Sequence, residues 1–109
     1  MIDYDGRRFR PAGDGADGGR VAVYRQDGDL LWGEFAGGNA RRGALAGTCR
    51  QDGTLEFAYC VVLTTGEVIS GRCSSTPRIL DDGRIQLDEL WERYGEHASA
   101  GTSRLLEIA

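Results

Sequence analysis

Glu89 is an acidic residue at a position where the surrounding pattern calls for an apolar side chain. It belongs to the stretch ILDDGRIQLDELWERY, and if this stretch is a strand, Glu89 shares a face with Leu87 and Trp91. A carboxylate in apolar surroundings needs a hydrogen-bonding partner, or its pKa rises until the group is neutral. Such an acid can orient a polar group of a ligand. With Tyr59 as a helper it can also donate and accept protons in catalysis.

Two alternatives remain open for this stretch. Glu89 can instead pair with an arginine or a tyrosine hydroxyl of a neighbouring strand and only fix the register. The stretch can also form a helix, because four apolar side chains fall at i, i+3, i+4 and i+7, namely Leu87, Leu90, Trp91 and Tyr94. We favour the strand, since the segment begins at a hairpin signal, Asp82-Gly83, and not at a helix N-cap.

Aromatic side chains are the second group that could do chemistry. Six aromatic residues fall within segments in which apolar residues alternate with others, namely Tyr24, Trp32, Phe35, Phe57, Tyr59 and Trp91. In a concave site, aromatic side chains with a few polar groups bind small apolar or aromatic ligands. The residues predicted to bind a ligand are Trp32, Phe57, Tyr59, Glu89 and Trp91. The alternative is that the aromatic side chains simply fill a core.

Further polar groups for such a site are Glu34, Glu67 and Arg72, although the phase of Arg72 in EVISGRC favours an outward position. The sequence has no GxSxG, HExxH or GxGxxG signature. Its one histidine, His97, lies among small residues and is interpreted as a solvent-exposed loop residue. We therefore expect no cofactor and no metal site, and the question of enzymatic activity stays open, with a non-enzyme favoured.

Composition narrows the function classes further. The chain has 109 residues, which predicts a single domain spanning 1–109. All 13 basic residues are arginine, which excludes a phosphate-loop or Schiff-base lysine. The net charge of −4 argues against nucleic acid as a partner, and no apolar segment predicts a signal peptide or a membrane span. The expected location is the cytoplasm, and a homo-oligomer stays open.

The three cysteines, Cys49, Cys60 and Cys73, are an odd number without CxxC spacing. This pattern is typical neither of a disulfide framework nor of a zinc site. We expect all three to be free thiols.

Turn signals predict the elements that would position these side chains. The chain has 17 glycines, and Asp-Gly pairs at 27–28, 52–53 and 82–83 join apolar alternating segments. Together with Thr65-Gly66 they define eight strands, of which the first is expected at 7–10 and the last at 102–108. Eight strands in sequential antiparallel order can close into an up-and-down barrel that holds one small ligand.

The connections of such a barrel alternate between its two ends. The first (AGDGADGG), third (GGN), fifth (TTG) and seventh (GEHASAG) share one rim, which we expect to be the mouth. The sixth connection, SSTPRILDDG, lies at the opposite end. There we expect Pro77 to stiffen it into a plug.

The segments YDGRRFR, GDLLWGEFAGG, GALAG, DGTLEFAY, TTGEVISGRCSSTP, LDDGRIQLDELW and SAGTS resemble small bacterial proteins commonly labelled "N-acetylglutamate synthase". The resemblance covers nearly the whole chain and implies an avidin-like β-barrel. An acetyltransferase of that name would need a pyrophosphate-binding turn, Arg/Gln-x-x-Gly-x-Gly/Ala, at a helix start. The nearest segment, RQDGTL at 50–55, ends in leucine and lies on a hairpin.

Three functions follow from the sequence. The favoured one is a barrel that binds a small apolar or aromatic ligand in its lumen. The second is a small barrel enzyme that uses Glu89 for acid–base chemistry, and the third is a module with a solid core that acts in assembly through its outer face.

Overall fold

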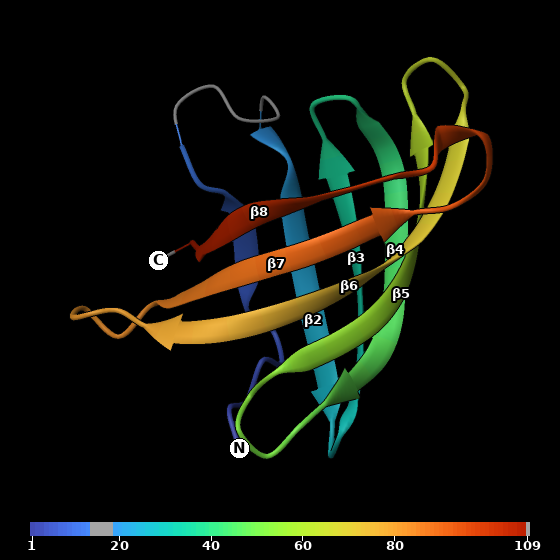
Figure 1. The fold of residues 1–109 in the computed structure, drawn as a ribbon. Coiled ribbons are helices and arrows are strands. Elements are labelled where there is room, and N and C mark those ends of the chain that lie inside the picture. The colour runs from blue at the N-terminus through green and yellow to red at the C-terminus, as the bar shows by residue number, and fades with distance from the viewer. Residues whose placement is uncertain (14–18, 109) are drawn as a thin grey trace.

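The computed structural model describes residues 1–13 and 19–108, which form eight antiparallel strands around a closed barrel (Figure 1). Each strand pairs with the next in the chain, and the last pairs with the first. The strands are β1 (Arg8–Pro11), β2 (Val21–Asp27), β3 (Leu30–Gly37), β4 (Ala40–Cys49), β5 (Leu55–Leu63), β6 (Val68–Ile79), β7 (Ile85–Arg93) and β8 (Ser99–Glu107). A short 3-10 helix, η2 (Gly95–His97), precedes β8. The predicted eight-stranded up-and-down barrel is confirmed.

The predicted hairpins occur where the Asp-Gly pairs stand, but two of them are one residue longer than expected. The Arg50 amide donates to the Thr54 carbonyl, so three residues form the loop, and Gly53 takes a φ of 87°. A carboxylate oxygen of Asp52 accepts the backbone N–H of Thr54 at 2.9 Å. Only glycine adopts this φ freely, and aspartate bonds its own turn, which explains the pair.

The stretch around Glu89 is strand β7, as predicted, and not a helix. Its residues pair with β6 on one side and with β8 on the other. Glu89 stands opposite Ser75 of β6 and Ser103 of β8. This register brings two small hydroxyl side chains to the sides of the acid.

The prediction for the sixth connection is wrong. The segment SSTPRI continues strand β6 to Ile79, and only a short turn follows before β7. Pro77 pairs with Leu87 of β7, whereas β5 stops at Leu55 opposite Ser75. Beyond Ser75, therefore, one side of β6 has no strand partner, and a sheet accepts proline at such an edge.

The N-terminal segment closes the barrel at this end instead. Tyr4 is fully buried and its hydroxyl donates to the Gly53 carbonyl at 2.7 Å. Its amide donates to the side chain of Gln26 at 2.9 Å. Tyr4 and Phe9 belong to the main apolar cluster, against which Ile2 also packs. The half of the barrel next to the N-terminal segment, called the lower half below, is consequently filled with side chains.

The other end carries the connections predicted to form the mouth. The first of them is the segment AGDGADGG, and its residues 14–18 lie outside the described part of the chain. Connections β3–β4, β5–β6 and β7–β8 lie at the same end (Figure 1). Among the described residues, none belongs to a helix with the length and apolar character needed to cross a bilayer.

Candidate functional site

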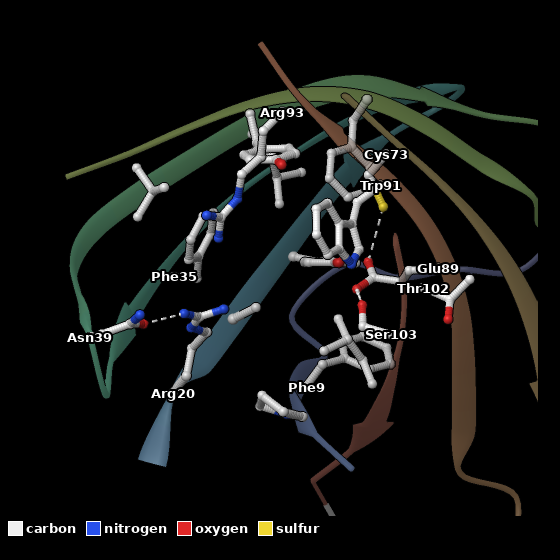
Figure 2. A pocket seen from close by; sticks show the side chains of 18 of the residues that line it. Phe9, Arg20, Phe35, Asn39, Cys73, Glu89, Trp91, Arg93, Thr102 and Ser103 are labelled. Atoms are coloured by element: carbon white, nitrogen blue, oxygen red, sulfur yellow. Dashed lines mark hydrogen bonds between the residues drawn. The ribbon is translucent and has the colours of Figure 1, made fainter. Parts of the chain in front are cut away.

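The upper half of the barrel contains a cavity of about 340 Å³. Six aromatic side chains line it, namely Phe9, Tyr24, Phe35, Phe57, Tyr59 and Trp91. Its charged lining groups among the described residues are Arg20, Glu89 and Arg93 (Figure 2). The volume lies at the lower end of the roughly 300–1,000 Å³ typical of small-molecule pockets.

Glu89 reaches into this cavity from β7, next to the Trp91 indole (Figure 2). One carboxylate oxygen accepts a hydrogen bond from the Ser103 hydroxyl at 3.0 Å. The other accepts from the Ser75 hydroxyl at 3.2 Å and from the Cys73 thiol at 3.3 Å. All three donors are neutral, so the expected alternative of an arginine or tyrosine partner does not describe this acid.

Burial raises the pKa of Glu89 above its usual value, and the three hydrogen bonds oppose part of that rise. Burial likewise raises the pKa of the Cys73 thiol, and the nearby Glu89 carboxylate adds to the effect. A protonated thiol is a poor nucleophile. Of these two groups, the acid is therefore the one suited to orient a ligand or to exchange a proton with it.

Tyr59 lines the same cavity from β5, but its hydroxyl faces another partner than Glu89. It donates to the backbone carbonyl of Glu92 at 3.3 Å. Burial raises the pKa of Tyr59, and the neighbouring Arg93 opposes part of the rise. The two residues predicted to act together thus share the cavity without a hydrogen bond between them.

Trp91 and Phe35 occupy their positions because glycines face them on the neighbouring strands. Trp91 pairs with Gly101, where an added Cβ would lie 2.6 Å from the indole. Phe35 pairs with Gly43, where an added Cβ would lie 2.1 Å from the ring. Both separations are shorter than any van der Waals contact, so a larger residue in place of either glycine would displace its aromatic partner.

Trp32 lies outside the cavity, contrary to the prediction. It is 39% exposed on the outer face of β3, whereas its neighbours Leu31 and Gly33 point inward and are buried. Gly33 pairs with Tyr24, and the Tyr24 ring uses the space that a side chain at position 33 would fill. In β3, therefore, the odd-numbered residues point into the barrel and the even-numbered ones point outward.

The other predicted polar groups also lie away from the cavity. Glu34 forms an exposed ion pair with Arg42 at 2.9 Å. Arg72 is exposed, as its phase predicted, and lies 3.5 Å from Glu56. None of these groups lines the lumen.

His97 belongs to η2, beyond the end of β7, and not to a loop. It is partly exposed, and its Nε2 lies 2.9 Å from a carboxylate oxygen of Glu67, so it is not the solvent-exposed loop residue that the sequence suggested. Neither residue lines the cavity.

The three cysteines are free, with Cys60 exposed and the other two buried. Within residues 1–13 and 19–108, no three His, Cys, Asp or Glu side chains gather as metal ligands.

Sequence reasoning missed four polar residues that line the cavity, Arg20, Asn39, Arg93 and Thr102. The signal for Arg93 was present, because it follows Glu89 and Trp91 at intervals of two along β7. Arg20 directly precedes β2 and stands in phase with Ala22 and Tyr24, so the same period of two pointed to it.

The model of one protein family, described as Avidin-like protein, matches residues 2–108. No curated protein and no solved structure matches the chain.

Proposed function

We propose that this chain, which belongs to the avidin-like protein family, binds a small molecule with an apolar or aromatic body inside its barrel. The fold of this family is known for binding small ligands. The observation that carries the proposal is the cavity of about 340 Å³ lined by six aromatic side chains. An apolar ligand that displaces water from these aromatic side chains gains the free energy of burying apolar surface.

The arrangement along β7 supports a bound ligand over a filled core. The lower inner positions, Ile85 and Leu87, are fully buried and belong to the main apolar cluster. The upper ones, Glu89, Trp91 and Arg93, line the cavity and are only partly buried. One strand thus provides a packed floor and, above it, a polar and aromatic wall for a ligand.

The two tryptophans allow a matched test with 1-anilinonaphthalene-8-sulfonate as the probe. A Trp32→Phe variant keeps only the cavity tryptophan, and a Trp91→Phe variant keeps only the outer one. Probe bound in the lumen should quench the fluorescence of the first variant saturably and at least as strongly as that of the second. Quenching that is stronger in the second variant, or absent from both, would contradict lumenal binding.

A native mass spectrum of the protein purified from its own host would identify a retained physiological ligand. The expected spectrum contains a species heavier than the chain, whose added mass disappears on denaturation. The same spectrum gives the number of subunits.

Acid–base catalysis is the second candidate function, because a carboxyl with a raised pKa lines the cavity. Its test is conversion of the retained ligand by wild type and by Glu89→Gln. Conversion that is lost in the variant while binding persists would support it. Acetyl transfer from acetyl-CoA to glutamate is not part of the proposal, and we expect no such activity above background in purified protein.

A further inference from the structure

Among the described residues that line the cavity, basic side chains outnumber acidic ones, whereas the whole chain is acidic. The chain carries a net charge of −4. The described residues that line the cavity contribute two arginines, Arg20 and Arg93, against one acid, Glu89. An acidic protein thus places two guanidinium groups at the wall of its cavity.

Arg93 is the more informative of the two arginines. It ends β7 at the mouth, is half-buried, and its guanidinium lies 5.5 Å from the centre of the Trp91 ring. Within the described residues it forms no ion pair, whereas arginines such as Arg42 and Arg104 pair with acids. One of its donors faces the Tyr59 hydroxyl, and the planar guanidinium has further donors that an anion can accept.

Arg20 lines the cavity from the start of β2. Its guanidinium lies 6.0 Å from the centre of the Phe35 ring and donates to the Asn39 side chain at 2.7 Å. In Figure 2, the guanidinium groups of Arg20 and Arg93 both extend into the lumen on the side of Phe35, away from Glu89. The positive groups thus lie at one side of the lumen, and the acid lies at the other.

The spacing along β7 sets the order of groups from floor to mouth. Glu89, Trp91 and Arg93 occupy successive inward positions. From Glu89 to Arg93 the strand rises by about 13 Å, at about 3.3 Å per residue. A ligand lying along this wall would meet the acid at its deep end, the indole in the middle and a guanidinium at the mouth.

We propose that the ligand is an organic anion with a flat apolar body, held with its carboxylate, sulfonate or phosphate group beside Arg93 and Arg20 at the mouth. This inference rests on the proposed function. Guanidinium groups bind such anions through paired, charge-assisted hydrogen bonds, which gain strength where water is partly excluded. The apolar body would lie against Trp91 and Phe35, and a neutral ligand of the same shape would lack the charge-assisted bonds to the guanidinium groups.

A pair of probes that differ by one sulfonate group tests the proposal. They are 1-anilinonaphthalene-8-sulfonate and the neutral N-phenyl-1-naphthylamine. Each is titrated into Trp32→Phe protein, and Kd is measured from the quenching of Trp91. A hydrogen bond to a charged group contributes enough for about a tenfold preference or more, so the sulfonate should bind at least about tenfold more tightly.

Substitution of Arg93 then tests whether this residue causes the preference for the sulfonate probe. Arg93→Gln should weaken sulfonate binding about tenfold or more and change the Kd of the neutral probe by less than about twofold. Arg93→Lys should restore part of the sulfonate preference. Arg78→Gln is the matched control, because Arg78 is exposed and does not line the cavity. This control removes the same charge and should leave both affinities unchanged.

The outcomes separate the two proposals. If neither probe quenches Trp91, the proposed function fails. If both probes bind with equal Kd in Trp32→Phe protein, the lumen binds small molecules but the anion proposal is overturned. This comparison needs no change at an arginine, so it holds even if the Arg93 variants fold poorly. A sulfonate preference lost equally in Arg93→Gln and Arg78→Gln would also overturn the proposal, since general surface charge would then explain it.

Discussion

Replacing Glu89 by glutamine should change stability little at pH 7. The carboxylate accepts hydrogen bonds only from neutral donors, at 3.0 Å from Ser103, 3.2 Å from Ser75 and 3.3 Å from Cys73. In the variant the amide oxygen can keep two of these bonds, and the amide N–H can donate to the remaining serine hydroxyl, which accepts as readily as it donates. We expect the free energy of unfolding to change by less than about 1 kcal/mol.

Glu89→Ala should be clearly worse, because the buried Ser75 hydroxyl loses its carboxylate acceptor and keeps only the weak contact with the Cys73 thiol at 3.6 Å. An unsatisfied buried group costs about 1–3 kcal/mol. The assay is urea denaturation of wild type, both variants and the control Glu92→Gln, which removes a charge from the exposed face of the same strand. A loss of about 3 kcal/mol or more in Glu89→Gln would refute the reasoning, since losses of that size mark the breaking of a buried ion pair.

The pH dependence of the same variant gives a second readout. Burial raises the pKa of Glu89 above its ordinary value of 4.5, so between the unfolded and folded pKa values the folded protein binds more protons than the unfolded chain. Relative to Glu89→Gln, wild type should be most stable below pH 4.5 and should lose stability as pH rises above it. The slope is at most about 1.4 kcal/mol per pH unit. Identical pH profiles for the two proteins would contradict the raised pKa.

Two further predictions concern the closed end and the thiols. Tyr4→Phe should lower the free energy of unfolding by about 1–3 kcal/mol, because the buried Gly53 carbonyl loses its hydrogen-bond donor. The control is Tyr94→Phe at an exposed position, which should change that free energy by less than about 0.5 kcal/mol. Urea denaturation measures both. In the native protein, a thiol reagent should rapidly modify only Cys60, which is exposed. After denaturation without reductant, it should modify all three cysteines. More than one rapidly modified thiol in the native protein, or fewer than three in denaturant, would contradict the structure.

The fold was predictable because its signals are local. Asp-Gly pairs between alternating segments set both the number of strands and their order, and Glu89 follows from the same period of two along β7. Trp32 was misplaced although its phase was available. It alternates with Gly33 and shares its face with Glu34, which is exposed.

The closure of the barrel end and the position of Pro77 depend on contacts between distant parts of the chain. Tyr4 closes the barrel through a bond to Gly53, 49 residues away, and no periodicity in either segment indicates it. Pro77 looked like a turn residue because the sequence does not show that β5 ends opposite Ser75. A local sequence pattern therefore does not show which residue closes the barrel end or where a strand loses its partner.

The most direct test of the central claim is an NMR titration that follows the two tryptophan indole N–H signals. Trp91 lines the cavity, whereas Trp32 lies on the outer face and is the internal control. On addition of N-phenyl-1-naphthylamine, which carries no charge, the Trp91 signal should shift and saturate while the Trp32 signal stays in place. A shift of Trp32 with Trp91 unchanged, or no shift of either signal, would contradict a ligand site in the lumen.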